Sequence, residues 1–466
     1  MVFSSMTFLY YFLPVVLLAY FVAPRVARNG VLLLASLFFY AWGEPKYLIL
    51  MSATILIGYC SALIIDSGRG KMSGKVTLMV ALCCCLGFLG IFKYANFFVD
   101  SFSRATGISV KYLNVTLPVG ISFYTFQLIS YIVDVYRGNV KAQKNIINLF
   151  TYVIMFPQLI AGPIVRYEEV EQELTSRTHS IPMIREGIVR FVIGLGKKVL
   201  IANQLGELAD IYYKVQDNSV AFAWVFAVAS ALQIYFDFSG YSDMAIGLGR
   251  IFGFRFPENF DYPYISRSIT EFWRRWHMTL GGWFRDYVYI PMGGSRVKSS
   301  RLVFNLLVVW MLTGLWHGAS WNFVVWGLFF GILLIIEKLW MLKYIQNAKG
   351  VNHIYVLFAT IISFVIFSSE DLSGAGSIMT NMFGLGGLKL ITSETLYHMA
   401  SYGFTLFVAI IGATPLVKLI ARKVMGVAEK YRLDTVLETV VLALILILST
   451  AHIVDGSFNP FLYFRF

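Results

Sequence analysis

The chain has 466 residues, of which 58% are hydrophobic and only 14% are charged. A soluble globular protein carries roughly 25% charged residues. The composition therefore excludes a soluble globular protein and indicates a polytopic membrane protein. The formal net charge of +12 could suggest a nucleic-acid partner. Cytoplasmic loops of membrane proteins are rich in Lys and Arg, however, and this is the simpler explanation.

Apolar stretches recur along the whole chain, and a helix needs about 20 such residues to cross a bilayer. The candidate spans are 6–25, 31–43, 46–65, 76–98, 117–136, 146–163, 186–214, 220–249, 302–316, 320–342, 353–369, 402–421 and 436–454. The first lacks a small-residue cleavage site and is expected to stay in the protein. Two stretches, 31–43 and 302–316, are too short to cross alone, and 186–214 contains Lys197 and Lys198. We expect these pieces inside a helix bundle or a water-filled cavity, because lipid cannot satisfy their polar groups.

The cysteines all lie within apolar runs, at Cys60, Cys83, Cys84 and Cys85. Such residues are predicted to be small core side chains, not disulfide partners or metal ligands.

The basic loops predict the orientation of the chain. Lys and Arg gather at 25–28, 69–75, 250–301, 338–349 and 422–432, and the positive-inside rule places these loops in the cytoplasm. The topology of 137–219 stays open. If 436–454 then crosses outward, the ending "NPFLYFRF" at 459–466 faces the outside, where an aromatic interface anchor is its simplest interpretation.

The most polar region of the apolar chain runs from "QIYFDFSGYSDMAIGLGRIFGF" (233–254) to "EFWRRWHMTLGGWFRDYVYIPMGGSR" (271–296). A single amphipathic helix is predicted for the second stretch, because its aromatic residues recur at spacings of three and four. That stripe is formed by Trp273, Trp276, Leu280, Phe284 and Tyr287, while Arg274, Arg275, Arg285 and Asp286 point elsewhere. The helix is either a membrane-surface anchor or one whose arginines line the mouth of a cavity for a phosphate-bearing ligand.

Two histidines stand out in this part of the chain. His277 is close to the apolar stripe, and a buried imidazole needs a partner. His317 lies in "LTGLWHGASWNFVVWG" (312–327), between two apolar runs. An ionisable residue at that depth predicts a functional site, and imidazole suits a general base, although a structural histidine at a helix break remains open. The possible partners of His317 are Asp237, Asp243 and Glu271.

These strings resemble the membrane-bound O-acyltransferase family, in particular its bacterial branch with the alginate O-acetyltransferase membrane subunit. The resemblance rests on "FWRRWHMTLGGWFRDYVYIPMGGSR" and "LTGLWHGASWNFVVWG". It is supported by "LPVGISFYTFQLISYIVDVYRG" (117–138), "FPQLIAGPIVRY" (156–167) and "FDFSGYSDMAIGLGRIFGFRFPENFDYPY" (236–264). It covers essentially the whole chain, 1–466, as one membrane-embedded domain with a core at 250–342 and an outer tail at 455–466.

The expected fold is therefore an all-α polytopic membrane protein with about 11 transmembrane helices, plus re-entrant and interfacial helices. The resemblance adds a central tunnel and implies that His317 and His277 are the family's two histidines. It implies a bacterial inner-membrane enzyme that takes an acetyl group from acetyl-CoA and passes it to an external partner for a polysaccharide hydroxyl. No metal and no permanently bound cofactor are expected.

Roles are also expected for further residues. Arg274, Arg275, Arg285 and Arg296 belong to a basic interfacial segment and are expected to hold the phosphates of the donor. Support is expected from Trp316 and Asn322 in addition to the three carboxylates. The tail residues Phe461, Leu462, Tyr463 and Phe464 resemble the Phe-x-Tyr-Phe ending of related envelope-acylating systems, which implies that Tyr463 is the candidate acyl acceptor.

Alternatives remain at this stage. The D-alanyl branch, which uses a carrier-protein thioester, is also similar to this chain. A transporter or flippase for lipid-linked sugars needs the same broken helices and polar residues, and a scaffold without chemistry is a third option. The final glycan is not identified by the sequence.

Overall fold

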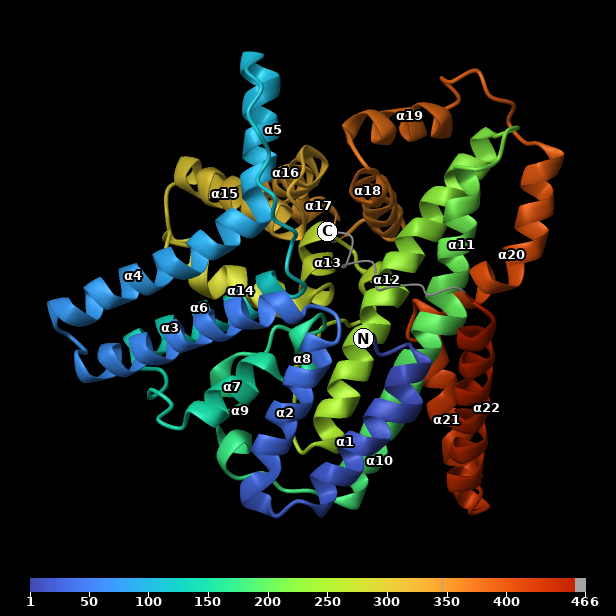
Figure 1. Cartoon of the computed structure of the whole chain (residues 1–466). Coiled ribbons are helices and arrows are strands. Elements are labelled where there is room, and N and C mark those ends of the chain that lie inside the picture. Colours follow the sequence, from blue (N-terminus) through green and yellow to red (C-terminus); the bar gives the residue numbers. More distant parts are fainter. Residues whose placement is uncertain (346, 457–466) are drawn as a thin grey trace. The chain divides into compact units, whose positions relative to one another are not determined.

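The computed structural model describes residues 1–345 and 347–456, and its regular structure there is helical (Figure 1). No strand occurs within these ranges, and the one extended pairing is an isolated bridge between Ser219 and Lys389. The predicted aromatic tail, including Tyr463, lies outside the described residues.

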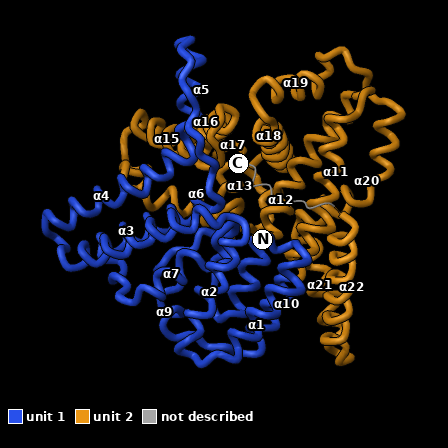
Figure 2. Tube along the Cα trace, viewed as in Figure 1, with its two compact units in different colours: residues 1–191, 242–257 blue, residues 192–241, 258–466 orange. Residues whose placement is uncertain are grey.

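The chain divides into two compact units, coloured separately in Figure 2. Unit 1 comprises Met1–Phe191 and Ser242–Pro257, and unit 2 comprises Val192–Tyr241 and Glu258–Phe466. The long helices α10 (Ile181–Gly196) and α12 (Val220–Ile251) contribute residues to both units.

Unit 1 contains the first half of the helices in chain order. They are η1 (Thr7–Phe12), α1 (Leu13–Val22), η2 (Arg25–Ala27), α2 (Arg28–Ala41), η3 (Pro45–Tyr47), α3 (Leu48–Ser67), α4 (Met72–Leu89), η4 (Gly90–Tyr94), α5 (Ala95–Thr106), α6 (Ile121–Arg137), α7 (Ile146–Ile154), α8 (Phe156–Leu159) and α9 (Tyr167–Thr175).

Unit 2 contains the remaining helices. They are η5 (Lys197–Ala202), α11 (Asn203–Tyr212), η6 (Pro263–Ile265), α13 (Ile269–Arg275), α14 (Met278–Phe284), η7 (Arg285–Tyr289), α15 (Ser299–His317), α16 (Trp321–Ile336), η8 (Glu337–Met341), α17 (Leu342–Ile345), α18 (Val351–Ser368), α19 (Leu372–Met382), α20 (Ser393–Gly412), α21 (Leu416–Lys430) and α22 (Asp434–Asp455).

The prediction of an all-helical, multi-pass membrane protein is confirmed. Among the described residues, 8 helices are long and apolar enough to cross a membrane, and a shorter apolar helix covers Thr7–Val22. The stretch predicted at 302–316 proves longer than expected, because α15 begins at Ser299 and reaches 19 residues.

Two predicted spans are interrupted by proline. The stretch 402–421 is not one helix: α20 ends at Gly412 and α21 begins at Leu416, after Pro415. In 146–163, α7 ends at Ile154 and the short α8 carries Pro157. A proline inside a helix removes a backbone donor and clashes with the preceding turn, which explains both breaks.

The prediction for the cysteines is only partly confirmed. All four are free, but Cys85 alone is buried, while Cys60 and Cys83 are exposed on the surface of their helices. An apolar run in a membrane protein carries lipid-facing positions as well as core positions, so hydropathy does not separate the two.

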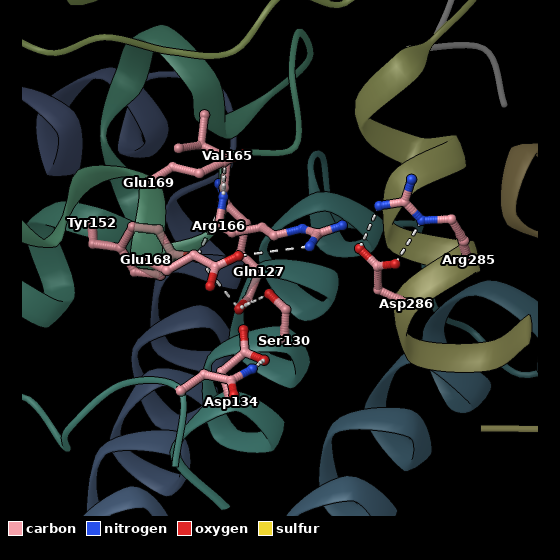
Figure 3. A network of polar contacts seen from close by, with 11 residues as sticks. Gln127, Ser130, Asp134, Tyr152, Val165, Arg166, Glu168, Glu169, Arg285 and Asp286 are labelled. Carbon is pink, nitrogen blue, oxygen red and sulfur yellow. Dashed lines mark hydrogen bonds and ion pairs between the residues drawn. The ribbon is translucent and has the colours of Figure 1, made fainter. Parts of the chain in front are cut away.

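A polar network lies around the start of α9 in unit 1 (Figure 3). The backbone N–H of Arg166 donates to Glu169 at 2.7 Å, and its guanidinium lies 3.7 Å from Glu168. The hydroxyl of Tyr152 donates to the carbonyl of Val165 at 3.0 Å. Tyr131 of α6 packs against Tyr167 with 4.8 Å between ring centroids, so the sequence blocks at 117–138 and 156–167 come together in this unit.

Candidate active site

His317 is the last residue of α15, where a close helix pair brings it beside α16. A Cβ atom on Gly314 would overlap the carbonyl oxygen of Phe323, and one on Gly327 would overlap that of Trp310. Small residues let membrane helices approach to backbone contact, and these two glycines serve that purpose. The chain leaves α15 at Gly318 in an extended conformation, which ends the helix at the histidine.

His277 lies at a break in what the sequence predicts as one amphipathic helix. α13 ends at Arg275, Trp276 is extended, and His277 has φ 42° before α14 begins at Met278. The segment around Asn259 stabilises this break through two backbone hydrogen bonds. The N–H of Asp261 donates to the carbonyl of Arg275 at 2.9 Å, and the N–H of Met278 donates to the carbonyl of Asn259 at 3.0 Å. The prediction of one helix was wrong because this tertiary pairing overrides the helical spacing.

The structure brings the two histidines together in unit 2. Their ring centroids are 6.5 Å apart, and the residues are only 1% and 2% exposed. We call the surrounding group the histidine cluster; it comprises His277, His317, Phe238, Trp316, Trp326 and Phe367. Trp316 packs against both imidazoles, with ring centroids 5.7 Å from His277 and 5.0 Å from His317.

Aromatic rings fill the remaining sides of the cluster. Phe238 contacts His277 edge-on at 4.6 Å between centroids. Trp326 and Phe367 contact His317 at 4.9 and 5.4 Å. The cluster therefore places two titratable rings in surroundings that are poor in charge, where electrostatic interactions are strong.

The tautomer of His277 follows from its hydrogen bonds. Oδ1 of Asn259 accepts from the backbone N–H of Thr279 at 3.4 Å and from its hydroxyl at 2.9 Å. The same oxygen lies 3.0 Å from Nδ1 of His277, so Nδ1 carries the proton and donates. Nε2 of His277 is then an acceptor, and it is buried without a hydrogen-bond partner among the described residues.

Burial also keeps this imidazole neutral. Desolvation disfavours the charged form and lowers the pKa of His277 to about 3. His277 is thus a neutral ring at physiological pH, and its acceptor nitrogen has no donor among residues 1–345 and 347–456.

The remaining predicted supporting residues have structural partners. Asn322 donates from its amide to the carbonyl of Ser369 at 2.9 Å, which ties the start of α16 to the end of α18.

The indole N–H of Trp326 is buried and has no hydrogen-bond acceptor within the described residues. Trp326 is therefore a donor beside His317 that the sequence did not single out.

Each of the three predicted carboxylates is held by a basic side chain. Asp237 pairs with Lys198 at 2.5 Å, and both are almost fully buried. In unit 1, Asp243 pairs with Arg190 at 2.9 Å. Glu271 is 3.0 Å from Arg275. Charge compensation of this kind is what buried carboxylates require.

A fourth carboxylate, Glu337, positions α13 and was missed by the sequence analysis. It is completely buried and accepts from the backbone N–H groups of Ile269 at 2.6 Å and Thr270 at 2.8 Å. Helix N-termini stabilise negative charge, so Glu337 acts as a cap delivered from η8. The sequence did contain a signal for this residue, because Glu337 is an acidic residue inside the apolar run at 320–342.

The four arginines predicted to bind the donor form two groups, one with carboxylate partners and one without them among the described residues. Arg275 contacts Glu271 and also Asp261 at 3.0 Å, and Arg285 pairs with Asp286 at 2.6 Å (Figure 3). Arg274 and Arg296 are exposed, and neither has a carboxylate partner within the described parts of the chain. Two of the four arginines are thus already paired, and two are available to an outside anion.

Comparison with known proteins identifies the family of the chain. A family model, described as MBOAT, membrane-bound O-acyltransferase family, matches residues 141–372, a segment that includes both histidines. The chain is 40% identical to the probable alginate O-acetylase AlgI of Pseudomonas putida, with all of both chains covered.

Two further relatives are named for other activities. The peptidoglycan O-acetyltransferase of Helicobacter pylori is 35% identical, covering 84% of this chain and 81% of that protein. The teichoic acid D-alanyltransferase of Bacillus subtilis is 31% identical, covering 48% of this chain and 61% of that protein. The family match, the full-length relative and the paired histidines lead to one conclusion: the chain is a multi-pass membrane O-acyltransferase that belongs to the membrane-bound O-acyltransferase family.

Proposed function

We propose that this chain moves an acetyl group from cytoplasmic acetyl-CoA through the bacterial inner membrane for the O-acetylation of an extracytoplasmic polysaccharide. An external partner transferase completes the reaction in this proposal. Full-length similarity to a probable alginate O-acetylase is the observation that carries it. Similarity to a peptidoglycan O-acetyltransferase supports a glycan acceptor without selecting one.

The transfer step needs a base for one proton. The acceptor oxygen attacks the thioester carbonyl, a C–O bond forms, the C–S bond breaks, and the hydroxyl proton ends on the CoA sulfur. His317 takes this proton and returns it to the leaving thiolate, a role that suits an imidazole because its ordinary pKa lies near neutrality.

His277 has a different role in the proposal. Its Nδ1 proton is engaged by Asn259, and its Nε2 is an acceptor without a partner among the described residues. In this tautomer the ring can orient a hydroxyl of the acceptor but cannot donate to an oxyanion. The indole N–H of Trp326 is the donor proposed for the oxyanion, since it lies beside His317 and lacks an acceptor among the described residues. A donor aimed at the developing charge is worth about 10²- to 10³-fold in rate.

Other residues are assigned to the donor and acceptor ends of the reaction. Arg274 and Arg296 are proposed to hold the phosphates of acetyl-CoA, because Arg275 and Arg285 already have carboxylate partners. Tyr463 is proposed as the outer acyl acceptor on the resemblance of its tail. A tyrosine hydroxyl has a pKa near 10 and needs a base to become nucleophilic, which His317 would supply.

The full chain in nanodiscs, incubated with acetyl-CoA labelled in the acetyl group, tests this function. Release of free CoA and label on the wild-type chain are expected, with the label lost in Tyr463→Phe and kept in Tyr431→Phe, a matched change at an exposed tyrosine. A D-alanyl carrier-protein thioester is the second arm. Turnover of the carrier-protein thioester alone would show that the transferred group is D-alanyl and not acetyl. Turnover of neither donor would favour a transporter or a scaffold.

A further inference from the structure

Unit 1 contains a basic cluster that the acyl-transfer chemistry does not use. It is formed by Tyr20 of α1, Arg28 of α2, and Arg177 and His179 of the segment between α9 and α10. We call these four residues the arginine cluster. The carbonyl of Phe252, just after α12, completes it: Tyr20 donates its hydroxyl proton to that oxygen at 2.7 Å.

The hydrogen bonds of the cluster fix the state of His179. Because the Tyr20 proton goes to the Phe252 carbonyl, the phenol oxygen acts as an acceptor, and Nε2 of His179 donates to it at 2.9 Å. Nδ1 of His179 then accepts from the guanidinium of Arg28 at 3.2 Å. The imidazole is a neutral ring held between a phenol and an arginine.

Arg177 is fixed more firmly than Arg28. Its Nε donates to the Tyr20 oxygen at 2.8 Å, and another guanidinium nitrogen donates to Asn29 at 2.6 Å. The guanidinium also lies over the ring of Phe254, 4.6 Å from its centroid. A Cβ on Gly253, whose φ is +87°, would come within 3.2 Å of the Arg177 side chain, so this turn leaves room for it.

The cluster carries positive charge without a counter-charge. Arg28 and Arg177 are half-buried, yet neither makes an ion pair with a carboxylate within the described residues. The pKa of His179 is lowered, first by burial and then by the positive charges of Arg28 and Arg177, while the backbone carbonyl of Phe252 opposes this shift. Partly desolvated cations of this kind are costly unless an anion meets them.

We propose that Arg28 and Arg177 form a binding site for a phosphate group, supplied either by an anionic phospholipid headgroup or by a soluble phosphate compound. Arginine presents its donors in a planar fork that matches phosphate oxygens. Each of these two guanidinium groups uses only some of its N–H donors in hydrogen bonds with the described residues. The loop at 25–28 belongs to the basic loops predicted to face the cytoplasm, where the leaflet carries anionic lipid.

The test uses the purified full chain in detergent, with phosphatidylglycerol and inorganic phosphate as separate probes. Binding of each is measured by native mass spectrometry and by the shift in thermal unfolding. One arginine near a lipid surface contributes about 1 kcal/mol, which corresponds to about a fivefold change in affinity. Arg28→Gln should therefore bind the probe that occupies the site about fivefold more weakly. Arg28→Lys keeps the charge but loses the planar fork, so its affinity should fall between those of Arg28→Gln and the wild type.

Lys71→Gln is the matched control, because it removes one positive charge from an exposed position in another basic loop. It should bind both probes as the wild type does. Weaker binding of phosphatidylglycerol alone by Arg28→Gln identifies a lipid site, and weaker binding of inorganic phosphate identifies a soluble ligand. Equal affinities of the wild type and Arg28→Gln, or no binding of either probe by the wild type, would overturn the proposal.

Discussion

His277 and His179 are both held as neutral imidazoles, but their surroundings achieve this in different ways. His277 is buried among aromatic rings with one neutral amide partner, and burial alone lowers its pKa. His179 is half-buried, and positive charge from arginines adds to the effect of burial. Desolvation is permanent, whereas repulsion by cations can be relieved by a bound anion or by salt. The first arrangement suits a fixed proton acceptor, and the second a site that responds to a ligand.

The largest effect is expected from removing the base of the histidine cluster. His317→Ala should lower acyl transfer by about 10²- to 10⁴-fold, the usual contribution of a general base. The rate is measured as CoA release by protein adjusted to equal membrane abundance. His452→Ala, at an exposed position on α22, should keep wild-type activity. Only a mild loss in His317→Ala would make this histidine a structural residue.

The next largest effect concerns the indole beside His317. Trp326→Phe keeps an aromatic ring in the cluster but removes the N–H, so the rate should fall by about 10²-fold. The KM for acetyl-CoA should change little, because the lost hydrogen bond forms with the transition state. Trp340→Phe, at a highly exposed tryptophan, serves as the comparison. A rise in KM with an unchanged kcat would refute the oxyanion role.

A smaller effect should appear in the pH dependence of stability. The unfolded chain protonates His277 near its ordinary pKa of 6.5, while the folded chain resists protonation down to about 3. The free energy of unfolding should therefore fall as the pH drops below 6.5, with about 2 kcal/mol lost from this group by pH 5 and no contribution above 6.5.

Thermal unfolding in detergent between pH 7 and pH 5 checks this effect. His277→Gln cannot take up a proton, so its stability should decline less steeply with acid than that of the wild type. His452→Gln should follow the wild-type slope, because that histidine is exposed. Identical slopes in all three proteins would show that His277 is not desolvated.

The smallest effect belongs to the arginine cluster. Arg28→Gln removes one of the cations that oppose protonation of His179, so the pKa of His179 should rise. The shift is followed by nuclear magnetic resonance of labelled histidine, with His179→Gln used to assign the signal. Lys71→Gln should leave this pKa in place. A pKa that does not change in Arg28→Gln would mean that burial alone keeps His179 neutral, as it does His277.

Several features of the fold and the site could be predicted from the sequence. Hydropathy places most membrane helices, since about 20 apolar residues are needed for each crossing. His317 was identifiable because an ionisable residue between two apolar runs is costly in a membrane. Pro415 and Pro157 indicate helix breaks, but the predicted spans at 402–421 and 146–163 were drawn through them.

Other features depend on contacts that no local pattern encodes. His277 adopts φ 42° because the segment at Asn259 pairs with both sides of the break, and a histidine in that conformation has no sequence signature. The tautomer of His277 depends on Asn259 and Thr279, which are not distinguished by hydropathy. Carboxylate partners such as Asp261 and Asp286 decide which arginines are available, and charge composition alone does not reveal them.

The contact between Gly314 and Gly327 has a consequence for how acyl selectivity can change. Two backbones already touch there, so the separation of α15 and α16 has a lower limit that no side-chain replacement can reduce. His317 lies three residues from this mechanical stop and takes its position from it. To fit a smaller acyl group, the two helices cannot move closer together, so the space beside the imidazole has to be reduced by larger side chains around it.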